Sequence, residues 1–333
     1  MANAANVIPS ISSGPPYPDG TAGFDPNLKL PRSYQWNMAV EKSFAGQHVV
    51  TVTYVGQAGR GLLRQEGSEQ PNASFAGAFL LTGNHAVSNY DALQCQYRLP
   101  LGGRLHGLLN YSWSHSMDDA SDDTIEATAI SSTVLSSAEY ASSTFDVRHS
   151  LSGALDYAIP ELGKRGFISE LTRDWSIDAT AVARTGFPFN LEVVTATIAG
   201  VYPRPNQIPG QPVWISNPSA GGGKSINPKA FAAPANGLQG TESRNKIRGF
   251  GLTQLDLSLG RQFAITDRIK LQFRTDAFNL LNHPNFSNPS GYFGEGATAL
   301  ESASMLNKGL GGLNPLFQEG GPRSLQLSLK LTF

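Results

Sequence analysis

Charged residues and cysteine are both scarce in this sequence. Only 15% of the 333 residues are charged, against about 25% in ordinary soluble proteins. The single cysteine, Cys95, cannot form an intrachain disulfide, and its place on a strand face favours a small apolar side chain over a reactive thiol. The net charge of -1 leaves no basic surplus of the kind that phosphate backbones attract, which argues against nucleic acid as a partner.

Long hydrophobic runs are absent as well. No stretch of about 18 consecutive apolar residues occurs, which excludes a transmembrane helix but not a barrel, whose strands are about 9–11 residues long and half polar. Residues 1–11 lack a basic n-region and a continuous apolar h-region, so no secretory signal peptide is predicted there. Because an exported barrel needs one, we expect a fragment or a misplaced start.

What the sequence does have is glycine, proline and period-2 alternation. The 35 glycines and 21 prolines favour many strands joined by turn-rich loops. Leucines 325, 327, 329 and 331 share one face of the last segment with Phe333, and polar residues including Lys330 fill the other. A one-residue slip would turn Lys330 toward hydrocarbon at a cost of roughly 2–4 kcal/mol near the bilayer midplane, so this facing is strongly fixed.

Similar alternation predicts nine strands in all, although it is weak in the second of them. They cover residues 34–41, 49–55, 93–99, 104–114, 150–159, 174–181, 254–259, 268–274 and 324–333.

Short and long connections alternate strictly between these strands. Tight links are expected at 44–47, 100–103 and 264–267, with a moderately short one at 160–171. Long links are expected at 57–89, 117–145, 196–251 and 282–322. This order is typical of a barrel whose tight turns all lie at one rim. It requires residues 175–195 to form one strand through Thr185-Gly186-Phe187-Pro188, where glycine and proline alternatively indicate a bulge or a turn.

The predicted fold class is therefore all-β, an antiparallel transmembrane β-barrel segment with long extracellular loops. Residues 1–31 are interpreted as a linker, the tail of an extracellular loop, and residues 32–333 as the C-terminal part of a barrel. Nine strands is an odd number, whereas bacterial single-chain barrels have even numbers. We expect further strands upstream, because an open edge at Tyr34 would leave backbone groups unpaired in lipid.

Six motifs in a fixed order resemble the C-terminal barrel region of Oar-like TonB-dependent outer-membrane transporters. They are PRSYQWN at 31–37, YVG at 54–56, NYDALQ at 89–94, YSWSHSMDD at 111–119, FDVRH at 145–149 and FNLLNHPNF at 278–286. The closing residues 329–333 resemble the terminal aromatic signal that barrel assembly machinery recognises.

This resemblance implies a larger protein with a signal peptide, a carboxypeptidase-regulatory-like β domain, a plug and a barrel of about 22 strands. The first three are not recognised in this chain. The implied location is the outer membrane, and the implied partners are its lipid, the assembly machinery through Phe333, an unknown solute, and the TonB complex only through the missing N-terminal part.

Four candidate polar sites each have a plainer interpretation, which we prefer. Carboxylates at positions 118, 119, 122 and 123 suggest a calcium site but lack EF-hand spacing, which favours a solvated outer loop. On a strand, Asp146 and Arg148 lie on one face and His149 lies on the other, so the three cannot act on one substrate atom. An ion pair between Asp146 and Arg148 is preferred to a catalytic set. The neighbours of His283, which are Asn282, Pro284 and Asn285, predict a turn at this position in preference to a metal site. The run GGGKS at 221–225 lacks the first glycine of a phosphate-binding loop, which favours a flexible outer loop.

Aromatic residues lie on the apolar faces near strand ends, which predicts membrane-interface girdles in preference to sugar- or base-stacking sites. The residues are Tyr34, Trp36, Tyr111, Trp113, Tyr157 and Trp175. No catalytic residue, cofactor or metal is predicted, and we do not expect an enzyme.

Two other classes remain open on alternation alone. A secreted soluble β-sandwich, β-solenoid or adhesin that binds carbohydrate has the same period, because one face of its sheets is buried. A β-rich hydrolase is the weakest alternative, since no nucleophile, base and orienting group occur with compatible facing. A barrel is expected to leave its apolar face uncovered, whereas a sandwich packs it against a second layer.

Overall fold

The computed structural model describes ten stretches of the chain. They are residues 14–44, 47–68, 70–101, 103–121, 139–161, 167–195, 202–236, 238–266, 268–306 and 320–333. Among these residues, no helix is both long enough and apolar enough to span a bilayer.

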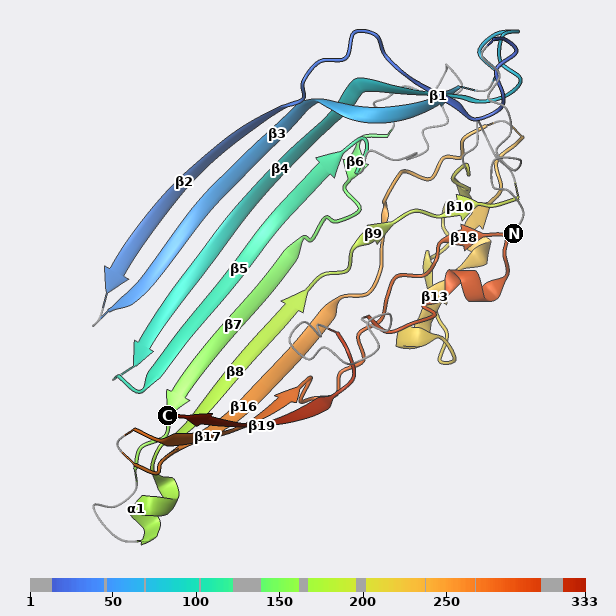
Figure 1. The fold of residues 1–333 in the computed structure, drawn as a ribbon. Coiled ribbons are helices and arrows are strands. Elements are labelled where there is room, and N and C mark those ends of the chain that lie inside the picture. Colours follow the sequence, from blue (N-terminus) through green and yellow to red (C-terminus); the bar gives the residue numbers. More distant parts are fainter. Residues whose placement is uncertain are drawn as a thin grey trace, which may run out of the picture.

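One sheet dominates the molecule, and its nine main strands lie side by side in chain order (Figure 1). Each is antiparallel to the next, as expected for strands joined by simple turns. The prediction of nine strands is confirmed. They are β2 (Arg32–Phe44), β3 (His48–Ser68), β4 (Phe79–Leu101), β5 (Leu105–Asp118), β7 (His149–Ala158), β8 (Trp175–Arg184), β16 (Leu252–Ala264), β17 (Lys270–Phe278) and β19 (Ser324–Thr332).

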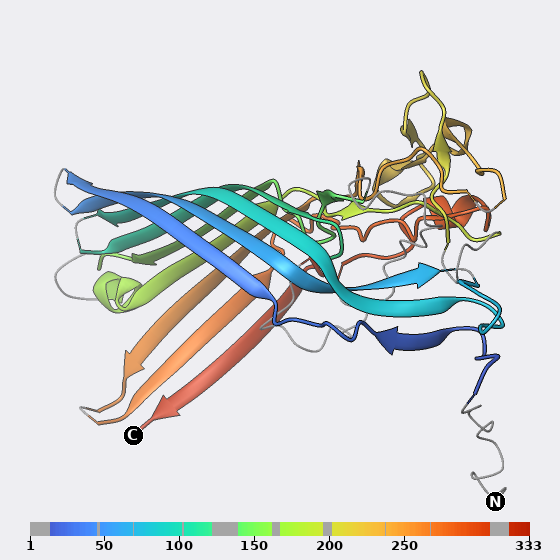
Figure 2. The same cartoon turned by 90° about the horizontal axis from the view of Figure 1, so that it is seen from above.

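The sheet is curved but open, so it forms part of a barrel wall (Figure 2). Within the described residues β2 and β19 are its two edges, and neither pairs with the other. Two short strands extend it at the side, β1 (Thr21–Phe24) beside β4 and β6 (Ala141–Ser142) beside β5.

Register places the apolar side chains of all nine strands on one surface, which we call the apolar face. On β2 and on the first half of β3, the even-numbered residues lie on this face. On the other strands, the odd-numbered residues lie on it. Leu93 lies opposite Tyr54 and Trp113, for example, and Leu259 lies opposite Ile177. The opposite surface, the polar face, holds the serines, threonines and amides. The alternation expected from the sequence is thereby confirmed across the whole sheet.

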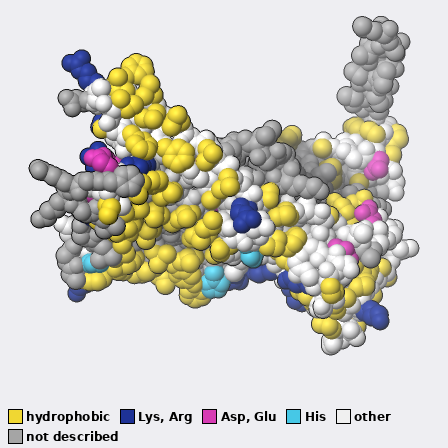
Figure 3. Space-filling model, turned by 90° about the horizontal axis from the view of Figure 1, so that it is seen from below, with side chains coloured by type: hydrophobic (Ala, Val, Ile, Leu, Met, Phe, Trp, Pro, Cys, Tyr) yellow, Lys and Arg dark blue, Asp and Glu magenta, His cyan; other side chains and the backbone are white. Residues whose placement is uncertain are grey.

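No described element covers the apolar face. Leu329 is 67% exposed and Trp113 is 55% exposed, and large apolar residues of β2, β5, β7 and β16 are also exposed. Figure 3 shows hydrophobic side chains gathered over much of the sheet. In a soluble sandwich these side chains would be packed against a second layer, so their exposure contradicts that interpretation.

All tight links lie at one end of the sheet, which we call the tight-turn rim, and all long links lie at the opposite end, the outer rim (Figure 1). The link between β7 and β8 carries the only α-helix among the described residues, α1 (Phe167–Thr172). The predicted order of short and long links is confirmed.

Two boundaries differ from the sequence prediction. β8 ends at Arg184, and the chain then leaves the sheet, because Pro188 and Phe189 pair with residues 247–248 instead of continuing the strand. The expected long link 57–89 is mostly strand, since β3 and β4 continue as a hairpin to Ser68 and Phe79. Register shifts between Gly59 and Arg64 break the alternation there, which hid the strands from the sequence pattern.

The two longest links fold together into a small outer unit made of short paired segments. Their bounds are β9 (Pro188–Phe189), β10 (Glu192–Val193), β11 (Asn206–Gln207), β12 (Trp214–Ser216), η3 (Gly221–Gly223), β13 (Lys224–Ile226), η4 (Pro228–Ala230), β14 (Phe231–Ala232), β15 (Ile247–Arg248), β18 (Tyr292–Phe293) and η5 (Ala297–Leu300).

The outer unit has a hydrophobic core of its own, formed by Leu191, Ile226, Ala230, Phe231, Ile247 and Leu300. The expectation of a flexible loop at residues 221–225 is therefore wrong. This segment forms η3 and the start of β13, which pairs with β12, and Ser225 is buried.

Candidate functional site

The polar face of the sheet is a ladder of hydrogen-bonding side chains. Gln96 Nε2 donates to Asn110 Oδ1 at 2.9 Å, and Asn110 Nδ2 lies 3.5 Å from Ser152 Oγ. These three residues are opposite one another on β4, β5 and β7. Such a surface suits water or a polar solute and is unsuited to lipid.

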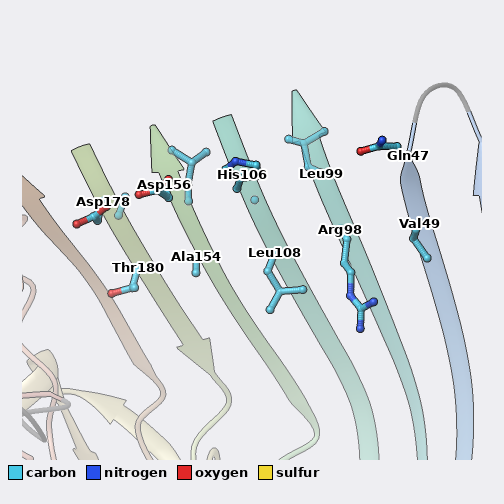
Figure 4. A pocket seen from close by; sticks show the side chains of 13 residues that line it. Gln47, Val49, Arg98, Leu99, His106, Leu108, Ala154, Asp156, Asp178 and Thr180 are labelled. Atoms are coloured by element: carbon cyan, nitrogen blue, oxygen red, sulfur yellow. The ribbon is translucent and has the colours of Figure 1, made fainter. Parts of the chain in front are cut away.

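A hollow of ≈ 600 Å³ lies on the polar face near the tight-turn rim (Figure 4). Its floor is a row of small and apolar side chains, Val49, Leu108 and Ala154, from β3, β5 and β7. Arg98 borders one side, and Asp156 and other polar residues lie toward the rim. The hollow therefore combines an apolar floor with charges of both signs at its border.

Next to this hollow, one arginine holds two carboxylates together. Arg274 Nη1 donates to Asp178 Oδ2 at 2.6 Å and its Nε donates to Asp276 Oδ1 at 2.8 Å. A third bond at 2.8 Å joins Arg274 Nη2 to Ser258 Oγ. The planar guanidinium group can make several such contacts at once. This cluster therefore holds side chains of β8, β16 and β17 in fixed positions relative to one another.

At the outer rim, the acidic residues 118 and 119 are buried and paired with arginines. Asp118 is 2% exposed and accepts from Arg244 Nη2 at 2.6 Å. Asp119 is 4% exposed and accepts from Arg64 Nη1 at 3.0 Å. The prediction of a solvated loop is wrong for these two residues, because both are buried. A buried carboxylate requires a partner, and the two arginines supply it. Asp122 and Asp123 lie outside the described residues.

Two further ion pairs join the outer unit to the link between β5 and β7. Arg204 makes a two-pronged pair with buried Glu139, at 2.8 and 2.6 Å. Asp146 accepts from Arg248 and from Ser116 N, and Arg148 Nε lies 3.3 Å from its carboxylate. The predicted Asp146–Arg148 ion pair is confirmed.

His149 points to the other face, as expected. Its Nδ1 lies 2.8 Å from Tyr111 Oη, beside the exposed ring of that residue on the apolar face. Asp146, Arg148 and His149 therefore do not converge on one point, and they form no catalytic set.

The outer unit contains a buried carboxylate that lacks hydrogen bonds. Glu242 is 2% exposed, and within the described residues neither of its carboxylate oxygens accepts a hydrogen bond. Burial raises the pKa of this carboxyl, and Lys246, 3.9 Å away, opposes the rise. Nearby in the chain, burial lowers the pKa of Lys224, whose Nζ lies over the rings of Trp214 and Phe250 at 4.2 and 4.8 Å.

The remaining sequence candidates have structural roles. His283 N donates to Asn279 Oδ1 at 3.0 Å, and Asn279 and Asn282 have positive φ angles, which confirms the predicted turn after β17. Cys95 is a free, half-buried thiol on the apolar face, opposite Val52 and Tyr111. No cluster of three or more metal-binding side chains occurs in the described part of the chain.

Sequence reasoning did not find the arginines at the outer rim. Arg64, Arg204, Arg244 and Arg248 lie in segments interpreted as loops, and their partners are up to 126 positions away. The sequence shows that these long links contain both arginines and carboxylates, but it does not identify which of them pair.

Residues 1–315 match the family described as outer membrane beta barrel domain. This chain belongs to that family. Its curved sheet is accordingly a segment of barrel wall in the outer membrane, and the apolar face is the lipid-facing surface. No curated protein sequence matches the chain.

Among solved structures, this barrel segment is similar to three outer-membrane proteins. YddB, an outer membrane transporter of Escherichia coli, superposes with a TM-score of 0.54 at 9% identity, over 94% of this chain and 34% of that one. The FrpB iron transporter of Neisseria meningitidis gives 0.47 at 10%, over 94% and 33%. A mutant of the ferric enterobactin receptor of Pseudomonas aeruginosa gives 0.41 at 15%, over 92% and 31%.

The chain thus spans about a third of each solved protein that it resembles. At this level of identity the likeness to YddB shows the fold alone.

Proposed function

We propose that this chain is the C-terminal wall of a TonB-dependent, Oar-like outer-membrane transporter and that it has no catalytic role. The observation that supports this best is the single uncovered apolar face that runs across all nine strands, opposite a face of hydroxyls and amides. A bilayer outside and an aqueous lumen inside account for both surfaces at once.

The direction of the wall follows from its links. In barrels of this type short turns are periplasmic and long loops are extracellular. The tight-turn rim, where Phe333 ends the chain with a 93% exposed side chain, then faces the periplasm, where barrel assembly machinery would bind it. The outer unit faces outward, and we assign it to ligand capture.

Buried arginine–carboxylate pairs suit this outer unit to specific binding. Arg244 and Arg204 hold it against Asp118 and Glu139, so its position relative to the lumen is fixed by paired, desolvated charges. Binding surfaces that are held in place lose less conformational freedom when a ligand arrives.

Completion of the wall requires further strands. With nine antiparallel strands in chain order, β2 and β19 both run toward the tight-turn rim, so direct pairing between them would be parallel. An odd number of additional antiparallel strands closes the wall, and a total of about 22 fits the Oar-like type. A plug and a TonB-contacting segment would belong to that remaining part.

Membrane topology tests the proposal directly. In a Cys95→Ser background folded in bilayers, we expect Ser328→Cys to react with a water-soluble maleimide and Leu329→Cys to stay unreactive, because a thiol in hydrocarbon does not ionise. Loss of TonB should abolish energy-dependent solute uptake by cells while leaving the protein in the outer membrane. A chain that remains monomeric and soluble after detergent removal would refute the assignment.

A further inference from the structure

One arginine of the tight-turn rim lies on the apolar face and has no carboxylate partner among the described residues. Arg261 follows Leu259 at the same parity on β16 and lies opposite Trp175 and Phe273. Its guanidinium carbon is 4.5 Å from the ring centre of Phe263 and 5.3 Å from that of Trp175. Arg64, Arg244 and Arg274, by contrast, are all paired with carboxylates.

Helix α1 is held beside this arginine by two bonds from the apolar face. Arg261 Nη2 donates to Glu170 O, and Trp175 Nε1 donates to Leu171 O at 2.8 Å. The guanidinium Nε has no hydrogen-bond partner within the described residues. Because Nε is also buried, the part of the guanidinium left for another acceptor is Nη1, which makes no hydrogen bond to the described residues.

The exposed side of α1 is apolar. Ile168 is 64% exposed and Leu171 is 52% exposed, and their i, i+3 spacing places them on the same side of the helix. Ile265, just beyond the end of β16, is 58% exposed. Apolar side chains beside a cation are typical of a segment that lies in the membrane interface.

The charged side chains that the strands carry on the apolar face near this rim share one sign. On the tight-turn half of the described strands, the apolar face carries two charged side chains, Lys42 on β2 and Arg261 on β16, and both are cationic. Each is followed two residues later by a phenylalanine, Phe44 or Phe263. Off the strands, at the same rim, Arg173 pairs with Glu170 and Asp174, so this triplet carries one net negative charge beside α1.

We infer that Arg261, with Trp175, Phe263 and α1, forms a binding site for the phosphate of a phospholipid headgroup in the periplasmic leaflet. The guanidinium fork matches phosphate oxygens, the two rings fix its plane, and Ile168 and Leu171 lie among the acyl chains. The site anchors the tight-turn rim at a defined depth. This inference rests on the proposed function, which places the tight-turn rim in the periplasmic leaflet.

Lipid retention measured by native mass spectrometry tests the site. The full chain in detergent is mixed with phosphatidylglycerol or with dioleoylglycerol, which has the same acyl chains but no phosphate. We expect several-fold more phosphatidylglycerol than dioleoylglycerol to remain bound. Arg261→Gln should reduce phosphatidylglycerol retention to the dioleoylglycerol level, whereas Arg261→Lys should keep part of it.

Arg268→Gln is the matched control, because Arg268 is exposed in the tight turn after β16 and the variant loses the same charge. It should retain phosphatidylglycerol as the unmodified chain does. Equal retention by Arg261→Gln, or equal retention of both lipids, would overturn the inference. Flotation of every variant with liposomes separates the two failures: loss of flotation by the unmodified chain defeats the transporter proposal, whereas normal flotation with retention independent of Arg261 defeats only the lipid site.

Discussion

Asp118 at the end of β5 and Arg244 in the outer unit are 126 positions apart, yet Arg244 Nη2 donates to Asp118 Oδ1 at 2.6 Å and both side chains are 3% exposed. A second bond of 2.9 Å runs from Arg244 Nη1 to Asp118 O. This pair ties the longest described link to the rim of the wall.

Removing one member of that pair should release the outer unit. Arg244→Gln leaves a buried carboxylate without its charge partner, which costs about 3–5 kcal/mol. We expect trypsin to cleave residues 202–251 faster by orders of magnitude, while the strands of the wall stay protected. Arg268→Gln serves as the control, and unchanged cleavage in Arg244→Gln would show that the pair does not hold the unit.

Gly56 of β3 leaves room for the indole ring of Trp36 on β2. A Cβ added at Gly56 would lie 2.2 Å from Trp36 Cε2, because the indole ring lies over the glycine of the neighbouring strand. Gly56→Val should therefore destabilise the wall by about 1–3 kcal/mol, as overpacking does. Trp36→Ala should lose this sensitivity, so a double-mutant cycle in urea should show strong coupling between the two positions. Additive effects would contradict the contact.

Burial of Glu242 makes the outer unit sensitive to pH. Its pKa is raised in the folded state, so the folded unit favours the protonated form. The stability that this provides is fully present below the pKa of the unfolded chain, about 4.3, and is lost as the pH rises through the folded pKa. We expect the urea midpoint to fall across that window.

Fluorescence of Trp214, with the other three tryptophans replaced by phenylalanine, reports this transition. Glu242→Gln should remove most of the pH dependence, because glutamine does not ionise. If the midpoint of Glu242→Gln still falls with pH as before, another group is responsible.

The sequence predicted the wall well because lipid and lumen impose opposite requirements on alternate residues. Leu93, Leu259 and Leu329 fall on the expected face, and the nine strands occur where alternation is regular. Beyond the outer rim both faces of the β3–β4 hairpin meet water or other loops, so residues 60–88 carry no clear period. Gly186 and Pro188 mark the end of β8, which the single-strand interpretation did not recognise.

The candidate site was less predictable for a different reason. Charge pairs such as Asp118 with Arg244 depend on how two distant links fold against each other, and local patterning contains no information about that. Aromatic residues were placed on the correct face, with Tyr157 and Trp175 toward the tight-turn rim and Tyr34 and Trp113 toward the outer rim. Their role as interface girdles stays a prediction.

The decisive measurement compares two neighbouring residues in the middle of the wall. Leu109 of β5 lies on the apolar face and Asn110 on the polar face. Folding of the protein into lipid bilayers, followed by denaturant titration, should show Leu109→Arg less stable by about 2–4 kcal/mol, the cost of a cation near the bilayer midplane. Asn110→Arg should lose about 1 kcal/mol, from its hydrogen bonds. Equal losses at both positions, or a larger loss at Asn110, would contradict a wall with lipid on one side and water on the other.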